Sequence, residues 1–508
     1  MLLDDLVEDA LLVIVAQLLL LKHKGDLANL ASTSRKIRDL CSPILFSRCV
    51  TTCSGRRGIP PESIRPFVHH LTYLGRLMVD YEDTFGPELP YLPELRAVTF
   101  NGCNFCDIPW AAFKRCLALP NVTSITFEPT TSFIGIFPAP DHDIMTLQPT
   151  LTAFTYNPDI WRALTKDPSR SAESPLETIP SRLADPYTTE YLSLSPLILQ
   201  ICDSVQSLTL PIEIAPWDRM VRLRWPELRR LCLSGQSPSQ TVSSLLCAFI
   251  NTLPRLTTLS VQLARKNGHR GRLSLLGPQH SRSFELRSLT LAYPDPNDTI
   301  FDIDSTFLTQ LSLRDNPRYY YHLAFSDVAR RWSAPILTSS ECLSVLRRMD
   351  LPALHTLELV YETDGDDDDL LRHISISFPR LMHLELHRYR RDRAQVVPHT
   401  HIAGILASAV SLRTVNLNLD FHDEVRLYSE DMPGRARCKD VRDARGWELA
   451  DIFEACRQLE YVAILTHGLS CSLWLQFHPR RCADPRYTAG SIDSPPLPRL
   501  PQMLPLAV

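Results

Sequence analysis

The chain has 508 residues, with 53 lysines and arginines against 57 aspartates and glutamates, so its formal net charge is −4. This balance gives no electrostatic basis for binding nucleic acid. Hydrophobic residues make up 44% of the sequence, enough for a sizeable core. The 14 cysteines are scattered, unlike those of a small disulfide-rich domain. This favours a reducing compartment, and we expect a cytoplasmic or nuclear location.

The chain begins with an apolar segment that could be a signal peptide, a membrane anchor or a helix of the folded protein. Four acidic residues and no basic one precede or begin this segment, whereas a secretory signal starts with basic residues. The apolar run over residues 10–21 is also shorter than the span of about 20 residues that a membrane requires. We therefore predict no membrane segment. We expect an amphipathic helix with one apolar stripe of Leu11, Ile14, Val15 and Leu18.

Two further helical segments follow within the first fifty residues. Asp26 is a plausible N-cap, and Leu27 and Leu30 lie on one side of the helix that it would begin. The order of residues from the start of the chain to Phe46 resembles the F-box. The parts of that pattern correspond here to residues 6–11, Ile14 with Leu18, 26–27, 34–38 and 43–46. Val7 stands where the family usually has proline.

The resemblance implies a three-helix module over residues 1–50 that binds the Skp adaptor of a cullin–RING ubiquitin ligase. So short a segment cannot bury all of its apolar surface alone, which independently suggests a partner. The residues expected to bind the adaptor are Leu6, Val7, Leu11, Ile14, Leu18 and Leu27. Alternatively, the same helices pack against the first repeat and only cap the array.

Residues 65–478 are dominated by the pattern apolar-x-x-apolar-x-apolar, as in Leu381-Leu384-Leu386. Its first position falls at residues 71, 95, 122, 151, 205, 228, 256, 286, 308, 354, 381, 412 and 459. Most steps are 22 to 31 residues long, and the three longer steps of 54, 46 and 47 residues predict a degenerate copy inside each. The last positions of each copy alternate with period 2, as in a half-buried strand.

Apolar residues at helical spacing precede many copies, as Trp110, Phe113 and Leu117 precede Val122. A proline two residues upstream of seven copies would end each helix. The repeat resembles the leucine-rich-repeat family in an irregular form, since the family's Asn or Cys after the strand appears only as Cys103 and Asn316. The resemblance implies an α/β solenoid with a parallel sheet on its concave face. Two proline-rich stretches are predicted to be an irregular insertion (157–200) and a disordered tail (479–508).

No sequence motif predicts an enzyme, a metal site or a cofactor. The Cys103–Cys106 pair lacks a second pair for zinc, and the acidic loop 364–369 lacks the spacing of a calcium loop. We instead expect the repeats to bind a protein substrate through strand residues that face away from the core. The candidates are His383 and Glu385 on one strand, joined at the end of that strand by Arg388 and Arg390.

Three alternatives remain open at this stage. The acidic loop 364–369 could neutralise the basic cluster 388–393 instead of leaving it free for a substrate. The tyrosines 319–321 could reach the binding surface or pack against the insertion before Leu354. The function implied by the two resemblances is that of a substrate-recognition subunit of a ubiquitin ligase. The alternative is a leucine-rich-repeat scaffold that is not coupled to ubiquitination.

Overall fold

A computed structural model describes most of the chain, and it contains two compact units, Met1–Glu227 and Leu228–Val508. The described residues are 11, 13–15, 17–18, 24–52, 60–74, 89–101, 107–128, 132–134, 147, 149–157, 188–267, 271–272, 274–276, 285–320, 332–392, 394–421, 432–467 and 472–479. Leu6, Val7, the Cys103–Cys106 pair and the tail from residue 480 lie outside them. Among the described helices, none is both long and apolar enough to cross a membrane.

The first unit begins with three helical segments that share a core. Residues 11, 13–15, 17 and 18 are helical, and α2 (Lys24–Thr33) and α3 (Arg35–Leu45) follow. The Ser34 hydroxyl begins α3 by accepting a hydrogen bond from the Ile37 N–H at 3.2 Å. The buried core residues are Leu11, Val15, Leu27, Ala31, Ile37 and Cys41. All six belong to the helical segments, so this core is separate from that of the repeats.

A parallel sheet follows directly from α3. Its strands pair in the order β1 (Arg48–Thr52), β2 (His70–Leu74), β3 (Ala97–Asn101), β5 (Ser124–Phe127), β7 (Ala153–Tyr156) and β8 (Ser207–Pro211). A small second sheet joins β4 (Asp107–Pro109) to β6 (Ser132–Ile134). The helices of this part are η2 (Arg65–Phe67), η3 (Leu89–Tyr91), α4 (Trp110–Leu117), α6 (Thr188–Gln200), η5 (Ile212–Ile214) and α7 (Trp217–Met220). The sequence pattern did not predict β1.

The core of the first unit contains a column of aromatic rings. Tyr73, Phe100, Phe127 and Tyr156 occupy the same position on four paired strands and are all buried. The Phe100 and Phe127 rings stack with their centroids 5.0 Å apart. Edge-to-face contacts extend the column at each end, at 6.0 Å to Tyr73 and 5.3 Å to Tyr156. Such pairs add roughly 0.5–1.5 kcal/mol each beyond the burial of their area.

The second unit is a longer array of the same kind. Its parallel strands pair in the order β9 (Arg230–Gln236), β10 (Thr258–Lys266), β11 (Ser288–Ala292), β12 (Gln310–Arg314), β15 (Thr356–Glu362), β16 (His383–Tyr389), β17 (Thr414–Asn418) and β18 (Tyr461–His467). The last strand, β19 (Ser472–Phe477), pairs with β18 in antiparallel orientation. Two short strands, β13 (Trp332–Ser333) and β14 (Leu337–Thr338), pair with β10 and β15.

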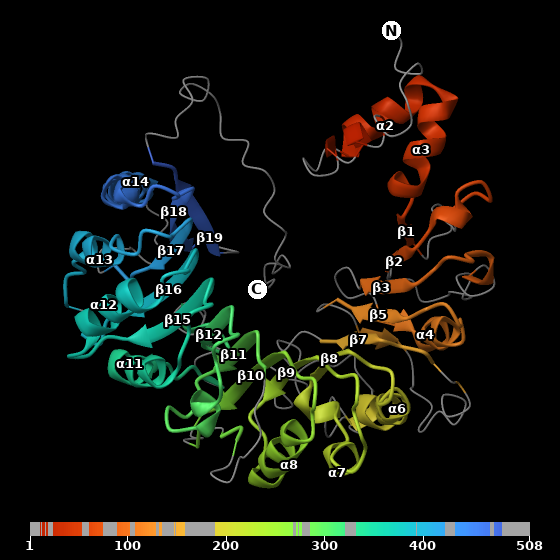
Figure 1. Cartoon of the computed structure of the whole chain (residues 1–508), viewed down its shortest axis with the longest axis horizontal. Coiled ribbons are helices and arrows are strands. Elements are labelled where there is room, and N and C mark those ends of the chain that lie inside the picture. The colour runs from red at the N-terminus through yellow and green to blue at the C-terminus, as the bar shows by residue number, and fades with distance from the viewer. Residues whose placement is uncertain are drawn as a thin grey trace, which may run out of the picture. The chain divides into compact units, whose positions relative to one another are not determined.

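Helices cover one face of the sheet in the second unit (Figure 1). They are α8 (Gln240–Asn251), η6 (Thr299–Asp302), α11 (Ser339–Arg348), α12 (Asp367–Ser377), α13 (His399–Leu406), α14 (Met432–Ile452) and η7 (Phe453–Ala455). Their apolar stripes are buried, as Leu370, Leu371 and Ile374 of α12 show. The opposite side of the sheet carries the alternating, partly exposed side chains, and we call it the polar face.

The predicted pattern matches the strands with two corrections. The first copy begins at Val68, not Leu71, because Leu71 pairs in register with Val98, the fourth position of the next copy. The three long steps also hold no degenerate copy in the main sheet, since β7 pairs directly with β8, β12 with β15, and β17 with β18. The last 13 residues of the predicted irregular segment 157–200 are helical, because α6 occupies Thr188–Gln200, and residues 158–187 lie outside the described residues.

Candidate functional site

In the first unit we give the name polar face to the side of the sheet that carries the partly exposed side chains. It carries a row of threonines in register. Thr72, Thr99, Thr126, Thr155 and Thr209 lie side by side on five paired parallel strands, and each is half-buried. Both neighbours of each threonine along its strand are apolar and buried. This threonine row is a neutral strip of hydroxyl and methyl groups without a charged side chain.

The corresponding row of the second unit becomes charged toward its C-terminal end. Ser312, Glu358, Glu385 and Asn416 are in register on β12, β15, β16 and β17. Adjacent like charges on paired strands destabilise a sheet unless a cation lies between them. We call this the charged row, and it is the candidate functional site.

Arg318, from the loop after β12, supplies that cation. Its Nη2 lies 2.6 Å from Glu358 Oε1 and 3.7 Å from Glu385 Oε1, and its Nη1 lies 3.1 Å from Asp315 Oδ1. Arg314 adds a second positive charge, with Nε 3.8 Å from Glu358 Oε1. Burial acts to raise the pKa of Glu358, but the two guanidiniums outweigh it and lower that pKa to about 2.

His387 fixes the orientation of Glu385. The His387 side chain is only 3% exposed, and its Nε2 lies 2.9 Å from Glu385 Oε1. Its other ring nitrogen lies 3.2 Å from the Asn418 amide, which donates 3.0 Å away to the Tyr389 hydroxyl as well. Burial acts to raise the pKa of Glu385, and the hydrogen bond from His387 helps to hold it below its usual value.

Aromatic rings flank the charged row. The Tyr320 ring stacks on His387 at 6.2 Å, and Trp474 of β19 meets the same imidazole edge-to-face at 5.7 Å. Tyr319 packs against Tyr389 at 4.5 Å. Of the alternatives for the tyrosines 319–321, the structure therefore places Tyr319 and Tyr320 against β16 residues, while Tyr321 lies outside the described residues.

The carboxylates and the imidazole of this site also form a set with metal-ligand chemistry. One ligand atom from each of Glu358, Glu385 and His387 lies within 4.8 Å of the others. The repeat spacing of 27 residues places Glu358 and Glu385 side by side on adjacent strands, but no local sequence motif indicates the set with His387. The positive charge of Arg318 already lies at this position.

The four predicted substrate residues fall into two groups. His383 and Glu385 are half-buried on the polar face of β16, where His383 Nδ1 lies 2.9 Å from the Thr414 hydroxyl. The prediction that Arg388 and Arg390 are exposed is wrong, because their side chains are only 3% and 6% exposed. Arg388 has the same parity as the core residues Leu384 and Leu386, so it points inward.

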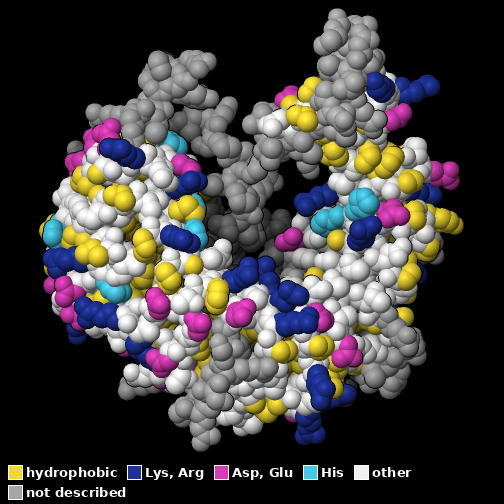
Figure 2. All heavy atoms as spheres, in the orientation of Figure 1, with side chains coloured by type: hydrophobic (Ala, Val, Ile, Leu, Met, Phe, Trp, Pro, Cys, Tyr) yellow, Lys and Arg dark blue, Asp and Glu magenta, His cyan; other side chains and the backbone are white. Residues whose placement is uncertain are grey.

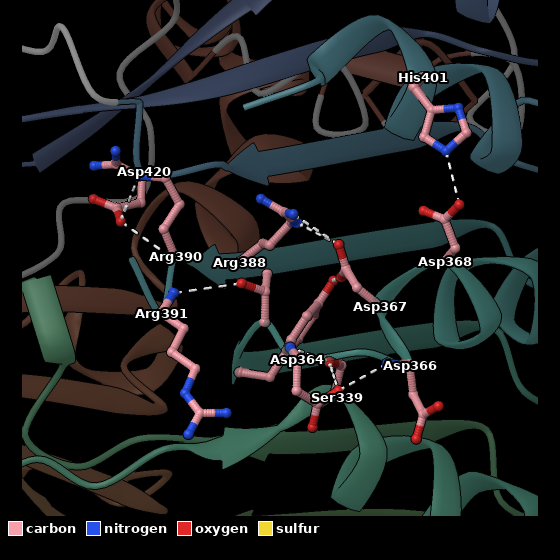
Figure 3. Close-up of polar contacts among 12 residues, drawn as sticks. Ser339, Asp364, Asp366, Asp367, Asp368, Arg388, Arg390, Arg391, His401 and Asp420 are labelled. Atoms are coloured by element: carbon pink, nitrogen blue, oxygen red, sulfur yellow. Dashed lines mark hydrogen bonds and ion pairs between the residues drawn. The ribbon is translucent and has the colours of Figure 1, made fainter. Parts of the chain in front are cut away.

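Acidic residues neutralise the two arginines, as Figure 3 shows. Arg388 Nη2 lies 2.7 Å from Asp367 Oδ2, and Arg390 Nε lies 3.2 Å from Asp420 Oδ2. Of the alternatives for the acidic loop, neutralisation therefore holds for Asp367. Asp364 has a different role, because its carboxylate accepts hydrogen bonds from Ser339 and Ser340 at the start of α11. Arg391 of the same cluster is exposed, and Arg393 lies outside the described residues.

The predicted adaptor-binding residues also divide by exposure. Leu11 and Leu27 are 1% and 0% exposed, so they belong to the module's core and not to its surface. Ile14 and Leu18 are half-buried, and Val13 is 62% exposed. Val13 was not among the predicted adaptor-binding residues, because it lies outside the apolar stripe of the first helix.

Charged side chains elsewhere are intermixed. Figure 2 shows basic and acidic side chains interspersed across the surface in view, with hydrophobic side chains scattered between them. In this view, no large area of the described surface carries side chains of only one charge. A local constellation such as the charged row is therefore a better candidate site than a long-range electrostatic surface.

Comparisons with known proteins give little further information. No protein-family model and no curated protein matches this chain. The chain is similar to the solved leucine-rich-repeat ectodomain of the plant membrane receptor kinase GASSHO1/SCHENGEN3 from Arabidopsis thaliana, in complex with CASPARIAN STRIP INTEGRITY FACTOR 2, at 12% identity and a TM-score of 0.26. The match covers 80% of this chain and 43% of that one, so the chain spans less than half of its length. The mostly parallel sheet with helices on one face is itself consistent with a leucine-rich-repeat-like solenoid.

Proposed function

We propose that this protein is a substrate receptor of a cullin–RING ubiquitin ligase. The N-terminal helical module would bind the Skp adaptor, and the polar face of the repeats would bind the target protein. Ubiquitin transfer would then depend on proximity, with no catalytic group supplied by this chain. The alternative is a repeat scaffold whose N-terminal helices only cap the array.

The observation that carries the proposal is the separate core of the helical module together with its exposed apolar residue. The six buried core residues all come from the helical segments, whereas a simple cap would share its core with the first strands. Val13 is 62% exposed, although burying such a side chain would be favourable. A protein partner that covers Val13 would account for its apolar character.

The repeat surface suits the second half of the proposal. Parallel strands hold their side chains in fixed register, so neighbouring residues of the threonine row or the charged row are positioned before any partner arrives. Preorganised side chains lose little conformational entropy on binding. These rows can therefore recognise one protein target without a catalytic site.

The test is capture of purified Skp adaptor by the full-length protein. We expect Val13→Asp, and more strongly Val13→Asp with Ile14→Asp, to weaken adaptor binding by about tenfold or more, because an ion would enter an apolar contact unpaired. Leu11 is unsuitable for this test, since a charge there would disrupt the module's own core.

Val410→Asp is the matched control, because Val410 is 68% exposed and lies in the second unit. Circular dichroism should show the same helical content for all variants. Adaptor binding that is unchanged by the double substitution would contradict the proposed contact. A wild-type protein that captures no adaptor would favour the scaffold alternative.

A further inference from the structure

The charged row and the charged side chains that contact it contain more negative than positive groups. Three carboxylates (Asp315, Glu358 and Glu385) surround two guanidiniums (Arg314 and Arg318). The Asp315 side chain is 1% exposed and that of Glu358 is 15% exposed, and both contact Arg318. Glu385 is the most accessible carboxylate, at 28% exposure, and it lies farthest from Arg318. The excess negative charge is therefore located where a partner can reach it.

Hydrogen-bond acceptors are also in excess at Glu385. Its Oε1 is held by His387, but among the described residues its Oε2 receives only a long contact of 3.4 Å from Asn416 Nδ2. Asn416 Oδ1 is buried and has no hydrogen-bond donor among the residues that the structure describes. Buried polar atoms normally find a partner. Glu385 Oε2, on the more accessible of the two residues, is therefore the acceptor that an N–H group from outside can reach.

The surroundings of Glu385 suit a flat or elongated cation. Tyr320 and Trp474 both contact the imidazole of His387, which itself contacts Glu385. Both aromatic side chains are only half-buried, so part of each ring faces solvent. Aromatic faces attract the ammonium of lysine and, more often, the guanidinium of arginine.

We propose that Glu385 binds a lysine or arginine side chain from a basic segment of the partner protein. The carboxylate would accept a charge-assisted hydrogen bond from the incoming cation. The strip of strands in register around Glu385 favours an extended segment. The inference rests on the proposed function in one respect, namely that the repeats bind a protein.

An acidic ligand fits the same place less well. Arg318 is already satisfied by Glu358 and Asp315, and an anion would have to approach the exposed carboxylate of Glu385. A divalent cation held by Glu358, Glu385 and His387 would have to displace the Arg318 guanidinium. A basic side chain needs neither change, because it would contact the side of Glu385 away from Arg318.

The test uses fluorescence anisotropy with the full-length protein and three capped, fluorescein-labelled peptides. The first alternates arginine with serine, the second replaces each arginine by citrulline, and the third replaces it by glutamate. Citrulline keeps the size and planarity of arginine but removes its charge. We expect the arginine peptide to bind most tightly and Glu385→Gln to weaken its binding by about tenfold.

Asp369→Asn is the matched control, because it also converts a carboxylate to an amide. Its side chain is 56% exposed on α12, in the helix layer, where it pairs with Arg372. This control should leave peptide binding unchanged. Equal weakening by both variants, equal binding of the arginine and citrulline peptides, or tightest binding of the glutamate peptide would each overturn the inference.

Adaptor capture by the same variants separates the two proposals. Glu385→Gln should bind the adaptor like the wild type, since Glu385 lies in the second unit and the helical module in the first. Loss of peptide discrimination with intact adaptor capture would refute only the basic-segment inference. Intact peptide discrimination without adaptor capture would refute only the ligase assignment.

Discussion

Arg388 shows how a single residue can change from a binding candidate to a core residue. Its guanidinium donates from Nε and Nη2 to Asp367 Oδ2, and the Tyr361 hydroxyl donates to the other oxygen of that carboxylate at 3.0 Å. Burial, followed by the charge of Asp367, raises the pKa of Tyr361 well above its usual range. The hydroxyl therefore stays protonated, and it can donate to Asp367 at any physiological pH.

We expect Arg388→Met to destabilise the protein by about 3–5 kcal/mol, because the buried Asp367 carboxylate would lose its cation. Replacing both partners, with Arg388→Met and Asp367→Asn, should recover much of this loss, since no unpaired charge would remain. Urea denaturation followed by circular dichroism measures both effects. A single variant as stable as the wild type would show that the pair is not buried in solution.

The second prediction for individual side chains concerns the stability of the folded protein at acidic pH. The pKa of Glu358 in the folded protein is about 2, below its usual value of 4.5, so its carboxylate stabilises the fold above about pH 4.5. That contribution is lost as the pH falls from 4.5 toward 2. The pKa of Glu385 is lowered as well, so it contributes in the same direction. We expect the unfolding temperature to fall over this interval, and to fall less steeply in Glu358→Gln. An identical pH dependence in this variant would contradict the assignment.

Among the helices, two glycines in neighbouring elements should respond oppositely to the same substitution. Gly446 lies within α14, where a Cβ would collide with the ring of Phe477 in β19. Gly404 lies within α13, where a Cβ would meet no atom within 4 Å. The first glycine therefore allows close helix–strand packing, whereas the second only lowers helix propensity.

Gly404→Ala should stabilise the protein by roughly 0.5–1 kcal/mol, because alanine is the better helix former. Gly446→Ala should destabilise it by about 1–3 kcal/mol through overpacking, despite the same gain in propensity. Thermal unfolding compares the two variants. Phe477→Leu added to Gly446→Ala should relieve part of the loss, and a stabilising Gly446→Ala would contradict the close packing of α14 on β19.

At the scale of the whole molecule, the sequence predicted the positions of the main strands but not the number of repeats between them. Apolar residues at fixed positions identified each main strand from β3 to β18, because one face of each must be buried. The residues at the positions that alternate with them, such as Glu385, were correctly placed on the polar face. The number of repeats was overestimated, since the length of a connection does not show whether it contains another strand.

The charged row itself could not have been predicted from local patterns. Glu358 and Glu385 occupy equivalent positions in successive copies, so their proximity followed from the repeat, but Arg318 lies in a loop that no pattern covers. The prediction that Arg388 is exposed was wrong for a related reason. The strand β16 continues past the motif to Tyr389, and this extension keeps the inward parity for Arg388.

Three pairs of strands are direct neighbours although long connections join them: β7 with β8, β12 with β15, and β17 with β18. This pairing determines where the length of the sequence can vary in evolution. Each pair closes a long connection, and the entropic cost of closing a loop grows only with the logarithm of its length, by about 0.6 kcal/mol for each doubling. Residues can therefore be gained or lost in the parts of these connections that lie outside their helices and outside the short strands β13 and β14, while the main strands keep their neighbours. Variation in length would be tolerated there, whereas a single residue added within a strand would turn its core side chains toward water.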